Sequence, residues 1–116
     1  MGHPREALKI CASQSTPMDE DDRHGCLALA YHSLGGRREA DRELEALRAL
    51  DGDSGAYHYA EIYAQWGEPA AALRWLTSAE RLRIPDLVWL KEDRQLEPIR
   101  NESAFKAIEQ RLNFPA

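Results

Sequence analysis

Four side chains in the helical patterns suggest a metal site: His24, Cys26, His32 and His58. On a helix, residues two positions apart point about 200° away from each other, so His24 and Cys26 cannot share one ion. His58 could approach Cys26 or His32 only across neighbouring helices. Zinc takes three or four ligands with supporting hydrogen bonds around them. We therefore predict no metal and no other cofactor, and interpret these histidines as ordinary surface or groove residues.

A nucleophilic pair is the second chemical possibility, formed by Cys26 with His32 or His58. Nucleophilic catalysis also needs an oxyanion hole and a third residue that orients the base. No glycine-rich elbow in the sequence supplies such a hole, so we predict that the chain is not an enzyme. Cys11 and Cys26 both lie in helical patterns, and two cysteines are too few for a small secreted scaffold. We expect free thiols in a reducing cytoplasm.

The charge balance argues against nucleic acid and membrane partners. The 116 residues carry a formal net charge of −5, and arginines alternate with acidic residues along the chain. A nucleic-acid binder usually has a basic face. No apolar run reaches the roughly 18 residues of a membrane helix, and the N-terminal residues lack a secretory signal. We predict a cytoplasmic protein that binds neither nucleic acid nor membrane.

The acidic run from Asp19 to Asp22 has two interpretations. It could be a docking patch for a basic partner. It could also occupy the first turn of a helix, where acidic side chains favour the positive end of the helix dipole. Thr16 and Pro17 before it are typical of a helix cap and first turn, and we favour this second interpretation.

Apolar residues recur at helical spacing, and no segment alternates as a half-buried strand would. The sequence therefore predicts an all-α fold. In the first half, two successive helices carry apolar residues at i, i+4 and i+7: Leu27, Tyr31 and Leu34, then Ala40, Leu44 and Leu47. The second half repeats this arrangement with Tyr59, Tyr63 and Trp66, then Ala72, Leu76 and Ala79.

A repeat of 32 or 33 residues underlies this pattern. Gly2, Gly35 and Gly67 each precede an alanine by five positions, and Tyr31 and Tyr63 stand four residues before the second and third glycine. A glycine can end one helix in a left-handed conformation at little cost. A proline in the first turn of the following helix, as at positions 4 and 69, has its φ angle already set. The small alanine then lets the two helices cross closely.

These residues resemble the tetratricopeptide repeat, a solenoid of antiparallel helical hairpins. The resemblance covers a half repeat (2–14) and two whole repeats (21–52 and 53–84), although Ala28 and Ala60 replace the glycine of the family's first helix. Residues 85–116 are similar to the segment that ends such arrays in many bacterial signalling proteins. We expect that segment to cap a single domain over 1–116, with a short helix begun by Pro85, a break at Pro98 and a helix over 103–112.

The resemblance implies protein binding in a concave groove lined by the first helix of each repeat, with a peptide or helix of a partner as the ligand. The positions that match the groove are Asp22, Cys26, Leu29, His32 and Ser33 in one repeat, and Tyr57, His58, Glu61 and Gln65 in the next. Tyr57 is expected to be an anchor outside the core. Some relatives bind the C-terminal carboxylate of chaperones with cations, but the matching positions here offer none and include Glu61, so this ligand is not expected.

An alternative function is assembly of the chain with itself. The half repeat 2–14 lacks its partner helix, so the apolar residues Ala7, Leu8 and Cys11 form a predicted edge. Solenoids need covered ends. This edge is therefore either covered by neighbouring repeats of a longer array, or paired in a homodimer of a bacterial signalling or transcription-regulatory protein.

Overall fold

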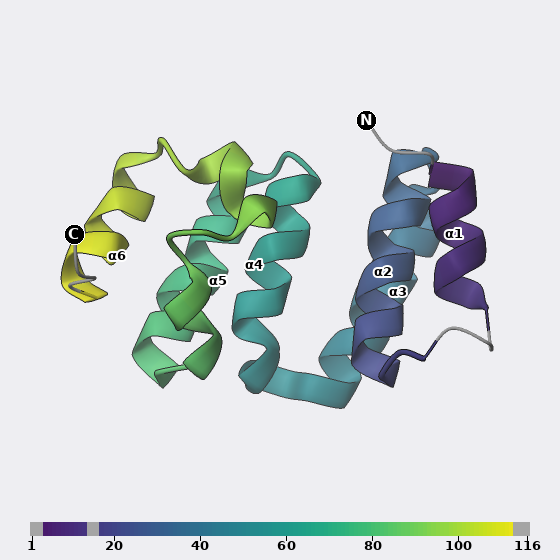
Figure 1. The fold of residues 1–116 in the computed structure, drawn as a ribbon, viewed down its shortest axis with the longest axis horizontal. Coiled ribbons are helices and arrows are strands. Elements are labelled where there is room, and N and C mark those ends of the chain that lie inside the picture. Colours follow the sequence, from purple (N-terminus) through teal and green to yellow (C-terminus); the bar gives the residue numbers. More distant parts are fainter. Residues whose placement is uncertain (1–3, 14–16, 113–116) are drawn as a thin grey trace. The chain divides into compact units, whose positions relative to one another are not determined.

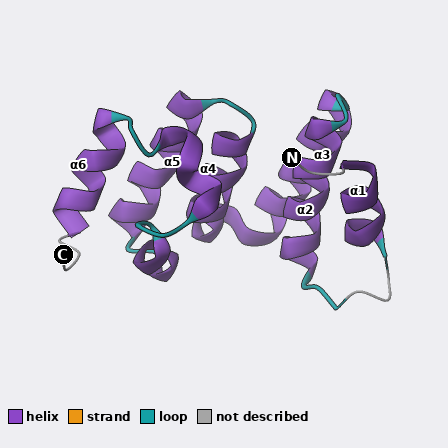
Figure 2. Cartoon of the chain, turned by 45° about the horizontal axis from the view of Figure 1, so that its top comes forward, coloured by secondary structure: helices purple, strands orange, loops and turns teal. Residues whose placement is uncertain are grey.

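The computed structural model of the chain describes residues 4–13 and 17–112, and all regular structure in these residues is helical (Figures 1 and 2). The all-α prediction is confirmed. The described residues divide into two compact units, Met1–Gly55 and Ala56–Ala116, each of which is described by itself. The α-helices are α1 (Pro4–Ala12), α2 (Glu20–Ser33), α3 (Arg37–Asp51), α4 (Ala56–Gln65), α5 (Pro69–Leu82) and α6 (Ser103–Leu112). Three short 3₁₀ helices complete the order: η1 (Gly52–Gly55), η2 (Pro85–Trp89) and η3 (Arg94–Ile99).

The first unit is built around the hairpin of α2 and α3, against which α1 packs (Figure 1). In α3 the buried side chains are those that the spacing predicts, with Ala40 and Leu47 fully buried. In α2 the predicted apolar positions are wrong, because Ala28 and Ala30 fill the seam while Leu27 and Tyr31 are half-buried and Leu34 is 38% exposed. His24 on α2 also reaches α3, where its Nδ1 lies 2.7 Å from Glu43 Oε1. The hairpin is thus held by an apolar seam with a polar contact beside it.

A disulfide between Cys11 and Cys26 joins α1 to α2, and the expectation of free thiols is wrong. The helices lie side by side with the two Cα atoms 5.7 Å apart, a separation that a disulfide spans without backbone movement. Arg23 strengthens the same junction, because its guanidinium donates hydrogen bonds to the carbonyls of Cys11 and Ser13 at the end of α1. The short helix α1 is therefore bonded to α2 covalently and by hydrogen bonds.

The glycine turns of the two hairpins have the same local structure. Gly35 and Gly67 adopt φ angles of +82° and +76°, in the left-handed region. After each, the chain closes the helix through an N–H that donates to the tyrosine carbonyl five residues earlier, from Gly36 to Tyr31 (2.8 Å) and from Glu68 to Tyr63 (3.0 Å). This is the glycine-dependent helix ending that the repeat pattern predicts. Gly2, the third glycine of the pattern, lies outside the described residues.

The second unit consists of the hairpin of α4 and α5, followed by η2, η3 and α6. Its core joins the hairpin to the C-terminal segment through Ala60, Leu76, Leu96 and Phe105, all of them fully buried. The segment η3 packs on α4, while α6 packs on α5. Residues 85–112 therefore complete the core of the hairpin.

Two local predictions from the sequence are wrong. Helix α2 begins at Glu20 with Asp19 as its N-cap, so Pro17 precedes the helix; Thr16 lies outside the described residues. Pro98 does not interrupt the helical structure but lies within η3. A short 3₁₀ helix tolerates this, because proline removes only one N–H donor and the helix ends at the next residue. The expected helices at Pro85 and over 103–112 are present.

Candidate functional site

The predicted groove residues of the first repeat all lie on α2, in the first unit. Asp22 and Ser33 are exposed, and Leu29 and His32 are half-buried. Cys26 is bonded to Cys11, so it offers no thiol for the metal site or nucleophile considered from the sequence. None of these five residues lines the pocket described below.

The predicted groove residues of the second repeat lie on α4, and the C-terminal segment covers part of their face. Tyr57, Glu61 and Gln65 follow one another at four-residue spacing and so share one side of the helix. The Tyr57 hydroxyl donates to Asp93 Oδ2 at 2.7 Å, and the Gln65 amide donates to the Gln95 carbonyl at 2.8 Å. The side expected to be open for a partner therefore packs against residues 93–95 of the chain itself.

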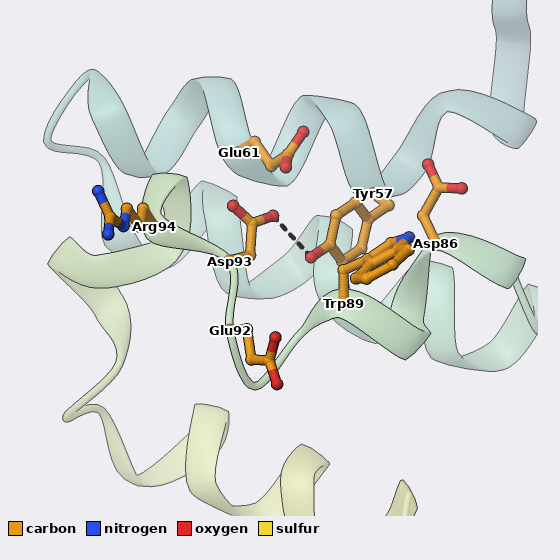
Figure 3. A pocket seen from close by; sticks show the side chains of 7 residues that line it. All are labelled: Tyr57, Glu61, Asp86, Trp89, Glu92, Asp93 and Arg94. Atoms are coloured by element: carbon orange, nitrogen blue, oxygen red, sulfur yellow. Dashed lines mark hydrogen bonds between the residues drawn. The ribbon is translucent and has the colours of Figure 1, made fainter.

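A pocket of about 500 Å³ remains between the first half of α4 and the segment from η2 to η3 (Figure 3). Two of the predicted groove residues, Tyr57 and Glu61, line it, while His58 and Gln65 do not. The residues of its wall are two aromatic, four acidic and one basic: Tyr57, Trp89, Glu61, Asp86, Glu92, Asp93 and Arg94. This volume falls in the range of pockets that bind small ligands or side chains of a partner.

Trp89 is the unusual residue of this pocket, because 63% of its surface is exposed. In η2, residues three apart lie on the same side, so Leu87 and Leu90 turn together into the core. Asp86 and Trp89 are then left together on the outer side, and both border the pocket. An exposed indole leaves a large apolar area that a bound molecule could cover.

Tyr57 belongs to the core as well as to the pocket. Only 3% of its surface is exposed, and it packs in the apolar cluster of the second unit. The expectation that Tyr57 lies outside the core is therefore wrong. Burial of the ring, followed by its hydrogen bond to Asp93, raises the pKa of the phenol above its ordinary value. Tyr57 acts as a neutral hydrogen-bond donor that fixes Asp93 in the wall.

Asp93 is the polar centre of the pocket. Burial by itself would raise the pKa of its carboxyl, whereas hydrogen bonds with Glu61 and Tyr57 lower it. The Gln95 N–H, 2.9 Å from Asp93 Oδ1, and the charge of Arg100 act in the same direction. The pKa of Asp93 is lowered in total, so this carboxylate is ionised at neutral pH.

Arg100 holds the loop that carries Glu92 and Asp93. Its guanidinium donates to the Lys91 carbonyl at 2.7 Å and to the Asp93 carbonyl at 2.6 Å. It also contacts Glu97 and lies 5.5 Å from the centre of the Phe105 ring. Arg100 thus connects the pocket wall to the core of the second unit without lining the pocket.

The sequence predictions missed five of the seven pocket residues, all of them between positions 86 and 94. Trp66, which stands at a predicted apolar position, is buried, but the sequence predictions assign no role to Trp89. The three-residue spacing of Leu87 and Leu90 was the available signal, since it leaves Trp89 on the opposite side of a short helix.

Two further features of the described residues carry no assigned chemistry. Asp19, Asp21 and Asp22 have carboxylate oxygens within 4.8 Å of one another. Asp21 and Asp22 lie in the first turn of α2, where the helix-dipole interpretation puts them. In the predicted oligomer edge, Ala7 and Leu8 are half-buried, and Cys11 is fully buried in its disulfide. The neighbouring Ile10 is 56% exposed.

None of the described helices has the length and apolar character needed to cross a membrane. Comparisons of the chain with family models, with curated proteins and with solved structures find no match.

Proposed function

We propose that this chain is a protein-interaction module of the tetratricopeptide type, which binds a peptide segment of a partner protein through the pocket of its second unit. The observation that carries the proposal is the exposed indole of Trp89 beside a pocket of about 500 Å³ with polar groups around it. Exposed aromatic side chains next to hydrogen-bonding groups are typical of residues that dominate binding energy in protein interfaces.

The two hairpins support the family assignment in this proposal. Each closes with a glycine in the left-handed region and the same N–H bond to a tyrosine carbonyl. Each also buries an alanine five residues after that glycine, Ala40 in one and Ala72 in the other. The turn, its hydrogen bonds and its packing residue thus recur at a period near 32. Such recurrence defines a helical repeat.

The cytoplasmic location is a prediction from the sequence, and the disulfide weighs against it. Disulfides persist mainly in oxidising compartments and are uncommon in the cytoplasm. The bond between Cys11 and Cys26 therefore favours an oxidising environment for the first unit. Mass measurement after alkylation of the protein in intact cells distinguishes the two environments.

Selection from a random library of 12-residue peptides tests the proposed interaction. Selected peptides are labelled, and their binding is measured by fluorescence anisotropy with the wild-type chain and with Trp89→Ala. The matched control is Val88→Ala. Val88 is the neighbouring apolar residue, is 66% exposed and does not line the pocket.

We expect Trp89→Ala to weaken binding at least about tenfold and Val88→Ala to change it less than about twofold. A selection that yields no peptide sensitive to Trp89→Ala would contradict the proposal.

A further inference from the structure

The pocket wall carries far more negative than positive charge. Asp86, Glu92 and Asp93 contribute carboxylates, against the single guanidinium of Arg94, while the fourth carboxyl group, that of Glu61, hydrogen-bonds to Asp93. Figure 3 shows Arg94 at one end of the pocket and Asp86 at the other, with the two aromatic rings close to the Asp86 end. The aromatic part of the pocket is therefore bordered by carboxylates rather than by the guanidinium.

Two of these carboxylates are not neutralised within the described residues. Asp86 and Glu92 are exposed, and no ion pair among residues 4–13 and 17–112 engages either of them. Asp93 is ionised as well, and Tyr57 and Gln95 hold its two carboxylate oxygens in place. A ligand thus meets uncompensated negative charge on both sides of the Trp89 ring.

The carboxylates do not converge as ligands of a metal ion do. In the part of the chain that the structure describes, the group whose oxygens gather within 4.8 Å is Asp19, Asp21 and Asp22, on another unit. In the pocket, Glu61 lies beside Asp93, and the remaining carboxylates, Asp86 and Glu92, lie apart from this pair around the rings of Tyr57 and Trp89 (Figure 3). Spread carboxylates around an indole suit an extended, flat cation better than a point charge.

We infer that the pocket recognises an arginine side chain of the partner peptide, with the guanidinium stacked on Trp89 and paired with Asp86 and Glu92. This inference rests on the proposed function and names the residue type that the interaction selects. A guanidinium is planar, stacks on aromatic faces and donates to carboxylates in pairs, and it loses little hydration when it does so. Lysine offers only a strongly hydrated point charge, and a carboxylate ligand would be repelled.

The test compares four peptides that differ at one central residue. The host is an acetylated, amidated Gly-Ser-X-Ser-Gly peptide, with X as arginine, lysine, leucine or citrulline. Citrulline keeps the shape and most hydrogen-bond donors of arginine but has no charge. Binding is followed by NMR titration of the ¹⁵N-labelled chain, where the Trp89 indole N–H and the backbone of residues 86–94 report on the pocket.

We expect the arginine peptide to bind at least about tenfold more tightly than the citrulline peptide, with lysine between them. Added salt should weaken the arginine complex and leave the citrulline complex unchanged. The double variant Asp86→Asn/Glu92→Gln should lose this preference for arginine. The matched control Glu102→Gln, which neutralises an exposed carboxylate outside the pocket wall, should keep it.

Each adverse result has a distinct meaning. Equal affinity for arginine and citrulline, with Trp89 signals shifted by both, would overturn the inference and leave the proposed peptide binding intact. Signals that stay unshifted with all four peptides would also overturn it, and the library selection then decides separately whether the pocket binds peptides at all.

Discussion

Reduction of the Cys11–Cys26 disulfide should loosen the first unit by an amount that follows from the length of the loop it closes. The bond joins residues 15 positions apart. In the chain-entropy model, a loop of this length destabilises the unfolded state by about 3 kcal/mol. Helix α1 has only nine residues, fewer than the roughly 12 that an isolated helix needs to be even marginally stable in water. Its packing on α2 therefore depends strongly on the covalent link.

Hydrogen exchange with mass spectrometry measures this effect in the first unit directly. A loss of about 3 kcal/mol corresponds to roughly a hundredfold faster exchange of the slowest amides of α2, when exchange follows the opening equilibrium. We expect that acceleration on addition of a phosphine reductant, together with nearly complete loss of protection in α1. The Cys11→Ser/Cys26→Ser variant is the matched control, and it should exchange like the reduced wild type with or without the reductant.

Two results would refute this reasoning. Identical exchange of the oxidised and reduced proteins would mean that the bond does not stabilise the folded unit. Alkylation of both cysteines in protein that was never reduced would mean that the bond does not form.

Three other predictions concern the pocket wall, and urea unfolding followed by tryptophan fluorescence tests them because Trp66, Trp75 and Trp89 all lie in the second unit. Tyr57→Ala should cost about 3–5 kcal/mol, as truncation of a buried aromatic ring does, whereas Tyr57→Phe, which removes only the bond to Asp93, should cost about 1–3 kcal/mol; equal costs would contradict the core assignment. The pKa of Asp93 is lower in the folded state, so ionised Asp93 stabilises the folded unit above the ordinary pKa of 3.8. This stabilisation is lost as pH falls through the folded-state pKa. The free energy of unfolding should therefore decrease below about pH 4, and it should decrease less in Asp93→Asn. Arg100→Lys should lower stability by about 2 kcal/mol and speed the exchange of residues 91–93, since lysine has one nitrogen in place of the two that donate to the Lys91 and Asp93 carbonyls. Unchanged exchange there would show that Arg100 does not hold the loop.

The helices could be predicted from the sequence because local rules determine them. Apolar residues at helical spacing give the buried faces of α3, α4 and α5, where Ala40, Leu47, Tyr59 and Leu76 lie at predicted apolar positions and are buried. The glycine turns follow from backbone chemistry at a single residue, which explains why Gly35 and Gly67 behave as predicted. The first residue of α2 does not follow from the sequence in this way, since any of several successive acidic residues can occupy the first turn of a helix.

The disulfide and the pocket could not be predicted in the same way because both depend on contacts between distant segments. The helical pattern gives the face of each cysteine, but not the rotation that brings Cys11 within 5.7 Å of Cys26 between Cα atoms. The pocket forms because residues 93–95 pack against α4. Asp93, which bonds to Tyr57 there, is 36 positions away from it in the sequence. Periodicity within one segment contains no information about that return.

The packing of residues 93–95 on α4 has a consequence for anyone who wishes to shorten or extend the protein. The C-terminal segment provides the acceptors for Tyr57 and Gln65, and Leu96 and Ile99 fill the core beside them. A hairpin cut after Leu82 would leave a phenol and an apolar face without cover, so the smallest piece suitable for grafting is the whole of 56–112. Likewise, a repeat inserted after α5 would have to match these acceptors and this apolar surface in place of the native segment.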